Sequence, residues 1–233
     1  MTIQRVIKDK KDYPSKHQLV TVLDEIPIWL LFLFLILFYL VLTFISNHYI
    51  YGKEIYLRSY ADRFPIKSIQ AFWDMKKEFW WTAYLLTPLI LFLKFSFTTV
   101  CISIGAVLSS VEFKFRTVFK NVLLAESVFL AGQVIFLINI SFHLNTVTLQ
   151  SASNYYPLSV LSYLEVNNVV KWLRYPLQTL NFFEVAYMVI IAWLLSKKWK
   201  ENIIESLAIV LPSYSTGLIL WLAFVAFLTL QIS

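Results

Sequence analysis

Five polar side chains interrupt apolar stretches of the sequence: Lys94, Glu126, Gln133, Asn181 and Glu184. Such side chains are costly in the hydrocarbon of a bilayer, and those found there usually face a bundle interior, a partner or a water-filled cavity. The separation of residues 126 and 133, like that of residues 181 and 184, places both members of a pair on one helix face. The five residues either line a path for an ion or a substrate or fix helix packing as buried contacts, and we favour the second.

The most specific prediction concerns the partner of Lys94. It lies roughly 14 residues, or about 20 Å of helix, from either end of its apolar stretch, which is too deep for its ammonium to reach water easily. An unpaired ammonium at that depth costs on the order of 2.5 to 3.5 kcal/mol. Because Glu126 and Glu184 are the acids of the neighbouring apolar stretches, the sequence predicts that Lys94 is shielded from lipid and contacts one of them, between the second, third and fourth expected spans.

The sequence carries no recognised catalytic motif. It has no glycine-rich phosphate loop, no His-Glu-x-x-His and no Gly-x-Ser-x-Gly, which argues against most enzymes. A single cysteine, Cys101, excludes an intramolecular disulfide and a multi-cysteine metal site. His48 and His143 are expected at the outer ends of spans, where they are more typical of boundary residues than of metal ligands. We therefore expect a protein without enzymatic activity, metal or cofactor.

The composition indicates a multi-pass membrane protein. Hydrophobic residues make up 59% and charged residues 15% of the chain, against roughly 45 to 50% and about 25% in soluble proteins. Several apolar runs approach the roughly 20 residues needed to cross a bilayer. The net charge is +6, and the basic residues lie between the runs, which suits lipid headgroups rather than nucleic acid.

The elements that must position the polar residues are all helical. We predict a bundle of about five transmembrane helices plus one or two interfacial amphipathic helices, one at 65–78 and one beyond Pro157, with a loop at 143–157. A basic cytoplasmic tail, 1–26, precedes a single transmembrane domain, 27–233. The expected spans are 27–46, 80–110, 119–142, 179–196 and 206–230.

Basic residues near the spans predict the orientation. The tail and the turns at 111–120 and 197–200 are rich in Lys and Arg, which places the N-terminus in the cytoplasm, most simply at a bacterial inner (plasma) membrane. The segment 47–79 is also basic and opposes this assignment. No small-residue cleavage site follows the first run, which is therefore expected to stay as a helix.

Three features between Thr87 and Phe227 follow one another in a familiar order. A basic turn at 115–122 leads into Leu-Leu-Ala-Glu-Ser-Val-Phe at 123–129, and Leu-Asn-Phe-Phe-Glu-Val at 180–185 precedes a Lys-rich turn and a last apolar helix. This layout resembles the Yip-domain family of five-span membrane proteins, named for Rab-type GTPase partners. The resemblance implies the fold. GTPase binding is not carried over, because no Asp-Leu-Tyr-Gly-Pro stretch precedes the first span.

Two functions are compatible with these observations. The first is an accessory or scaffold subunit of a membrane assembly, or a protein of membrane organisation, with the lipid bilayer and a membrane protein or a second copy as its partners. The second is a small transporter or channel with a polar path lined by Lys94, Glu126 and Glu184. The lack of a catalytic motif and the short loops favour the first.

Overall fold

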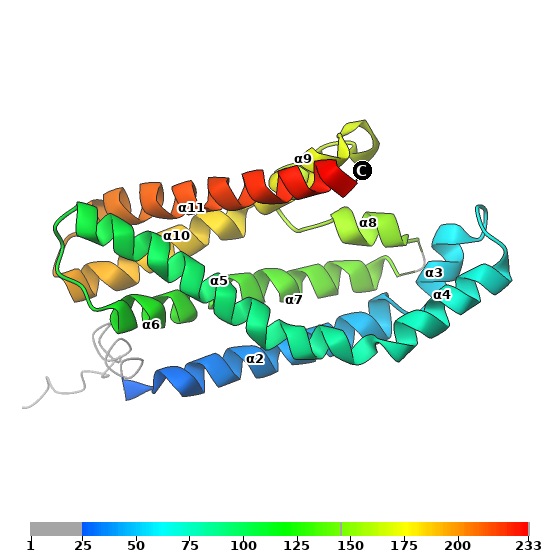
Figure 1. Cartoon of the computed structure of the whole chain (residues 1–233), viewed down its shortest axis with the longest axis horizontal. Coiled ribbons are helices and arrows are strands. Elements are labelled where there is room, and N and C mark those ends of the chain that lie inside the picture. The colour runs from blue at the N-terminus through cyan, green and yellow to red at the C-terminus, as the bar shows by residue number, and fades with distance from the viewer. Residues whose placement is uncertain (1–24, 145, 233) are drawn as a thin grey trace, which may run out of the picture.

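The computed structural model describes residues 25–144 and 146–232, and this part of the chain is helical without a strand. Five helical columns run along the long axis in alternating directions (Figure 1). They are α2 (Ile28–Ile45), α5 (Trp80–Leu108), the pair α6 (Phe115–Ala125) and α7 (Ser127–Phe142), α10 (Phe182–Trp199) and α11 (Ile203–Ile232). Residues 1–24 of the expected basic tail lie outside the described residues.

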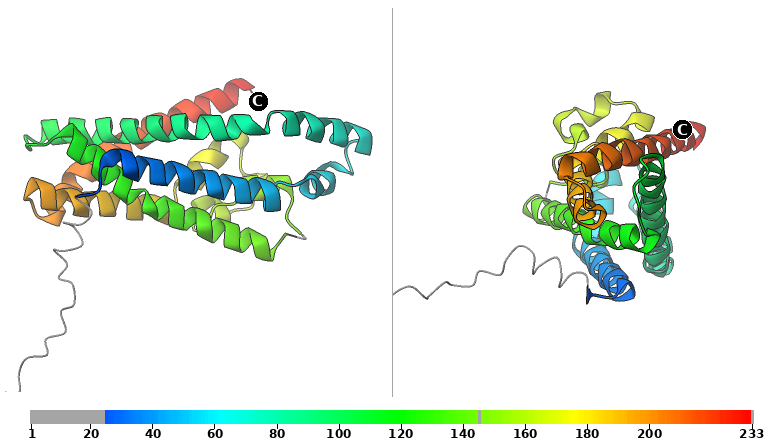
Figure 2. Two further views of the ribbon diagram at one scale, coloured as in Figure 1. Left: turned by 90° about the horizontal axis from the view of Figure 1, so that it is seen from below. Right: turned by 90° about the vertical axis from the view of Figure 1, so that its left-hand side faces the viewer.

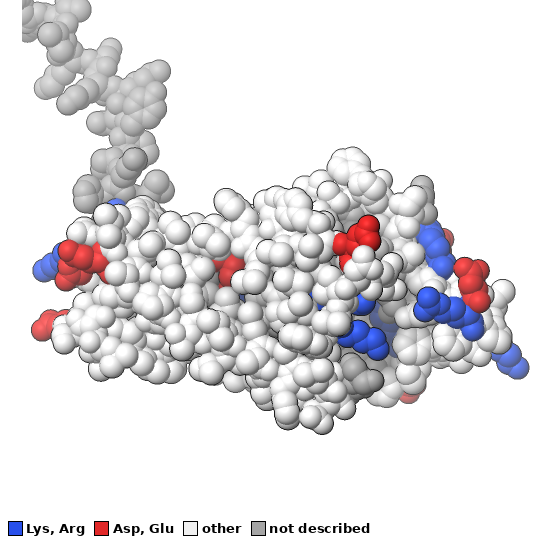
Figure 3. Space-filling view, turned by 90° about the horizontal axis from the view of Figure 1, so that it is seen from above, with Lys and Arg blue, Asp and Glu red and all other residues white. Residues whose placement is uncertain are grey.

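Four of these columns are long and apolar enough to cross a bilayer: Ile28–Ile50, Trp80–Leu108, Phe115–Phe142 and Ile203–Gln231. This agrees with the expected all-helical membrane protein. The face drawn in Figure 3 has its charged side chains near the two ends and an almost uncharged band between them. The fifth column, α10, is 18 residues long and includes Glu184, Lys197 and Lys198, so its length and composition alone do not mark it as a span.

Helix α10 nevertheless lies at the centre of the bundle. Its residues Tyr187, Ile191, Ala192 and Leu195 are completely buried, and it packs against α11, α6 and α7. By contrast, α2 lies at the periphery in the end-on view of Figure 2, and its buried residues are Leu35 and Leu42. The most apolar helix is thus the one most exposed to lipid, as expected where lipid tails are as apolar as leucine.

Small residues allow α5 and α11 to approach closely. A Cβ atom added to Gly105 would lie 1.8 Å from Ser213 Oγ, and one added to Gly217 would lie 2.5 Å from Cys101 Sγ. The two helices run antiparallel, so each contributes a pair of small residues one turn apart to the crossing. Close approach through small side chains is a common way for membrane helices to associate.

The third expected span, 119–142, is longer and is interrupted at Glu126, which separates α6 from α7. The other spans differ from expectation mainly at their ends. Helix α2 continues as a π-helix, Ser46–Ile50, while α10 begins three residues later than expected and α11 three residues earlier. End shifts of this size are ordinary, because fraying and capping decide them.

A small helical layer caps the bundle at the end reached by α2 and α7 (Figure 1). It contains α3 (Lys53–Tyr60), α4 (Ile66–Glu78) and α8 (Leu149–Asn154), the last within the stretch expected to be a loop. Ile55, Tyr56, Ile69 and Ala152 form its core. The helix expected at 65–78 is α4.

The prediction of an amphipathic helix directly after Pro157 is wrong in its position. The chain forms two 3₁₀ turns, Val160–Tyr163 and Val166–Asn168, and only then α9 (Lys171–Thr179). Leu158 has a positive φ of 56°, and backbone hydrogen bonds join Val160 N–H to Leu180 O and Phe182 N–H to Leu158 O. The pairing with residues 180–182 therefore keeps the start of this segment out of a helix, which the spacing of apolar residues along the sequence cannot reveal.

Candidate functional site

The central polar cluster is built on Glu126, which is completely buried. Lys94 Nζ of α5 donates to Glu126 Oε1 over 2.6 Å, and Tyr39 of α2 donates its hydroxyl proton to the same oxygen over 2.5 Å. Three columns therefore meet at one carboxylate oxygen. Hydrogen bonds with a charged partner are about twice as strong as neutral ones, so this contact joins the columns firmly.

The break between α6 and α7 positions the carboxylate. Glu126 N–H is shared between Val122 O and Leu123 O, each 3.2 Å away, and Glu126 O accepts the first amides of α7 from Phe129 and Leu130. Glu126 is thus the N-cap residue of α7. Because Glu126 is also the C-cap residue of α6, the dipoles of the two helix ends oppose each other there, and the ammonium of Lys94 is what compensates the carboxylate.

An aromatic ring completes the surroundings of Lys94. Its ammonium lies 4.1 Å from the centre of the Phe129 ring, a cation–π contact. The Lys94 side chain is nevertheless 37% exposed. The contact predicted with Glu126 or Glu184 is thus made with Glu126, and the described chain leaves part of the Lys94 side chain uncovered.

A second polar pair joins the neighbouring columns α10 and α11. Tyr214 donates its hydroxyl proton to Glu184 Oε1, and both residues are buried. Glu184 lies within electrostatic range of Lys94 and Glu126. Glu184, the other predicted partner of Lys94, therefore lies in the same region but is hydrogen-bonded to Tyr214.

Tyr187 stands between the two pairs. Its ring contacts those of Phe129 and Tyr214, with centroids 4.8 Å and 5.6 Å away. Its buried hydroxyl is near Thr98 but makes no hydrogen bond of good geometry with a described residue, and the same is true of Glu126 Oε2. The cluster therefore keeps one donor and one acceptor unused inside the bundle.

Tyr156 approaches this region from the loop after α8. Burial raises the pKa of its hydroxyl, and the negative charges of Glu184 and Glu126 raise that pKa further. Its hydroxyl also limits space beside α7, since a Cβ atom on Gly132 would lie 2.8 Å from it. This tyrosine therefore stays protonated at physiological pH.

The two remaining predicted residues have other surroundings. Asn181 is the N-cap of α10: its Oδ1 accepts from Glu184 N–H over 2.9 Å, and its Nδ2 donates to Gln178 O and Thr179 O. The separation of residues 181 and 184 thus reflects helix capping rather than a shared bundle face. Gln133 is half-buried, and its side chain makes no hydrogen bond with any residue in the described ranges.

Sequence reasoning missed the tyrosines of the cluster, Tyr39, Tyr187 and Tyr214. A tyrosine in an apolar run is typical of a membrane interface, and nothing in the sequence separates these three from such residues. Only their burial and their carboxylate partners do so.

The histidines and the cysteine lie apart from the cluster. His48 stacks on Phe44, His143 Nδ1 is 2.9 Å from Asn139 O, and Cys101 packs at the crossing of α5 and α11. Within the described residues, no three His, Cys, Asp or Glu side chains are grouped so that they could hold a metal ion.

Comparison of the chain with models of protein families, with curated proteins and with solved structures finds no match. The resemblance to the Yip-domain family remains a prediction from the sequence motifs.

Proposed function

We propose that this protein is a non-enzymatic multi-pass membrane protein that serves as an accessory or scaffold subunit of a membrane assembly or in membrane organisation. The observation that carries the proposal is that the charged groups in the middle of the bundle are hydrogen-bonded to side chains of other helices. Lys94 and Tyr39 bind Glu126, and Tyr214 binds Glu184. Such contacts hold columns together, as a scaffold requires.

In this proposal α10 is a fifth span, and the end of the bundle at residue 28 faces the cytoplasm of a bacterial cell. The central position of α10 supports the crossing, because its Tyr187 contacts Phe129 of α7 and Tyr214 of α11, two helices that are long and apolar enough to span. Lys114, Arg116, Lys197, Lys198 and Lys200 lie in or beside the turns at that end, which supports the orientation.

The second half of α11 is the surface we propose for a protein partner in the membrane or a second copy. None of residues 219–231 is buried, and Leu220 and Phe224 are 64% and 51% exposed. The test below separates a protein partner from lipid at this surface.

The full chain would be purified from its native membrane in mild detergent, and co-purifying proteins would be quantified. We expect a stoichiometric partner or a second copy that is lost in the Leu220→Ala/Phe224→Ala variant. Leu33→Ala/Leu37→Ala removes exposed leucines from the outer face of α2 and should leave the complex intact. A chain that stays a lone monomer, with or without these changes, would contradict the proposal.

A small transporter or channel is the second candidate function. It is favoured by the unused Glu126 Oε2 and Tyr187 hydroxyl and by the 37% exposure of the Lys94 side chain. Proteoliposomes would then show an ion or proton flux that Glu126→Gln abolishes and that Glu205→Gln, an exposed acid of α11, leaves unchanged. Flux equal to that of protein-free liposomes would remove this candidate.

A further inference from the structure

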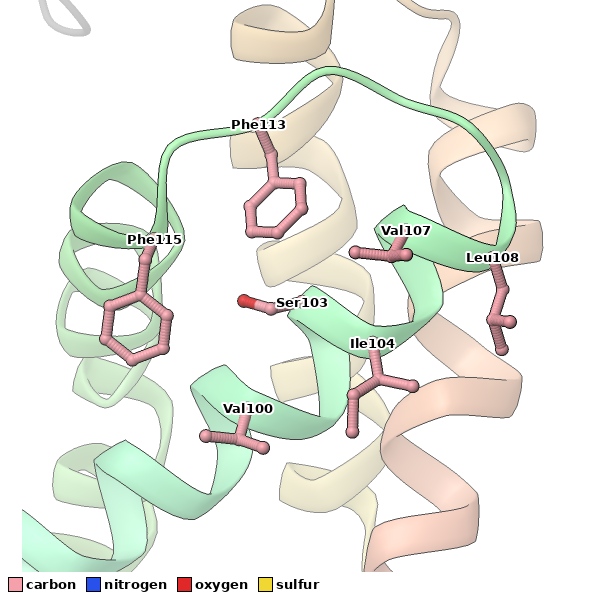
Figure 4. A pocket seen from close by; sticks show the side chains of 7 residues that line it. All are labelled: Val100, Ser103, Ile104, Val107, Leu108, Phe113 and Phe115. Atoms are coloured by element: carbon pink, nitrogen blue, oxygen red, sulfur yellow. The ribbon is translucent and has the colours of Figure 1, made fainter.

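A hollow of about 340 Å³ lies beside the last turns of α5, where the chain turns back into α6. Its lining includes Val100, Ser103, Ile104 and Val107 of α5, with Phe113 and Phe115 from the turn and the start of α6 (Figure 4). All but Ser103 are apolar, and Val107 and Ile104 are more than half exposed. The hollow therefore opens sideways, toward lipid.

Ser103 is the unusual member of this lining. It is only 8% exposed, and its Oγ has no hydrogen-bond partner among the described residues. Other hydroxyls of the same helix are satisfied locally, since Thr87 donates to Ala83 O and Thr99 to Phe95 O. Figure 4 shows the Ser103 hydroxyl directed from α5 toward the side of the hollow formed by Phe113 and Phe115. A buried donor without a partner thus lies in the wall of the hollow.

Two basic residues are the sequence neighbours of one residue that lines the hollow. Lys114 and Arg116 flank Phe115, and both are exposed. Neither side chain has an ion pair or hydrogen bond with a described residue, and the one acid of the turn is Glu112. The first helical hydrogen bond here is made by Thr117 N–H to Lys114 O. The amides of residues 115 and 116 precede it and remain available for an anion at the helix N-terminus.

We propose that this is a binding site for an anionic glycerophospholipid. One acyl chain lies in the hollow along α5, which from Val100 to Val107 offers about 10 Å at 1.5 Å per residue. The Ser103 hydroxyl donates to an ester carbonyl, and Lys114 and Arg116 hold the phosphate. The combination of an apolar hollow, a buried donor and two cations within one helix turn matches the layout of such a lipid. The site does not depend on the scaffold or transport function proposed above.

The charge requirement is tested by native mass spectrometry of the full chain in detergent, titrated with phosphatidylglycerol and with phosphatidylcholine of identical acyl chains. We expect phosphatidylglycerol to bind about 30-fold more tightly, since two basic residues near a membrane surface contribute about 1 kcal/mol each. Lys114→Gln/Arg116→Gln should remove most of this preference. Lys197→Gln/Lys200→Gln removes two charges from the other turn at the same end and should keep it.

The place of the acyl chain is tested by filling the hollow. Val100→Trp should weaken the binding of both lipids about tenfold. Val189→Trp, at an exposed position of α10, should leave their binding unchanged. Ser103→Ala should weaken the binding of both lipids about threefold, because one neutral hydrogen bond is lost. Melting in detergent identifies variants that misfold, and Ile104→Phe, at a more exposed lining position, replaces Val100→Trp in that case.

Three results would overturn the site. These are equal binding of the two lipids by the unaltered chain, a preference that survives Lys114→Gln/Arg116→Gln, and unchanged lipid binding in the hollow-filling variants. Displacement of the lipid by millimolar inorganic phosphate would likewise show an anion site without a lipid chain.

Discussion

At the scale of single residues, the molecule is organised around Glu126 Oε1. This atom accepts from Lys94 Nζ and from the Tyr39 hydroxyl, while the other oxygen of the carboxylate has no partner in the described part of the chain. Removing one partner of a buried ion pair costs far more than replacing both, because the remaining charge is left uncompensated. The cluster therefore makes specific predictions for single and double substitutions.

Glu126→Gln should lower the free energy of unfolding by about 2 kcal/mol. This is less than the 3–5 kcal/mol of a fully buried pair, because the Lys94 side chain is 37% exposed. Lys94→Met in the same chain should restore much of the loss. Thermal unfolding in detergent of both single variants and the double variant measures the coupling. Additive losses would show that the two charges act independently.

Tyr39→Phe should cost about 1.5 kcal/mol, the lower end of the range for a hydrogen bond to a charged group. For a chain of this length such a loss lowers Tm by about 3–6 °C. Tyr84→Phe is the matched control, since that hydroxyl has no hydrogen bond with a described residue. Equal Tm values for the two variants would mean that the Tyr39 contact does not stabilise the bundle.

At the scale of elements, helix breaks and helix crossings decide how the columns meet. The interruption at Glu126 turns one apolar run into α6 and α7 and places the carboxylate at a helix N-terminus. The crossing of α5 and α11 depends on Gly105 and Gly217, which leave room for Ser213 and Cys101. The backbones of the two helices approach closely at these contacts, so adding even one methyl group is expected to lower the stability.

Gly105→Ala should destabilise the protein by about 1–3 kcal/mol, because the new methyl would lie 1.8 Å from Ser213 Oγ. Ser213→Gly in the same chain should recover part of the loss by removing the clash. Gly52→Ala is the control, since its nearest contact would be 3.7 Å away. A Gly105→Ala variant as stable as the Gly52→Ala variant would exclude a tight crossing.

At the scale of the whole molecule, the alternating columns place the turns at 109–114 and 200–202 at one end and α3, α4 and α8 at the other (Figure 1). The buried centre of α10 joins α6, α7 and α11. If α10 crosses the membrane with its neighbours, the segments before and after it lie on opposite sides.

Cysteine labelling in a Cys101→Ala background tests this arrangement. We expect Ser153→Cys to react with an impermeant reagent on intact cells, and Lys114→Cys and Lys200→Cys to react only after permeabilisation. Labelling of residues 153 and 200 from the same side would show that α10 does not cross. Labelling of residue 114 from outside would reverse the orientation.

The sequence by itself determined the class of the protein and limited the partner of Lys94 to two acids. Apolar run length sets the helical membrane class, because backbone groups in lipid must be satisfied within helices. The depth of Lys94 requires an acid nearby, and only two were available.

Tertiary structure alone decided which acid Lys94 binds, because the choice between Glu126 and Glu184 depends on how helices distant in sequence are packed. It also placed Tyr39, Tyr187 and Tyr214 in the polar cluster, because their roles follow from burial rather than from residue type. Asn181 caps α10 through local side-chain hydrogen bonds, and Leu158 begins a segment that pairs with residues 180–182, a contact between residues distant in sequence. A pattern along one chain records which side chains prefer lipid, but contacts between columns arise only when the columns meet.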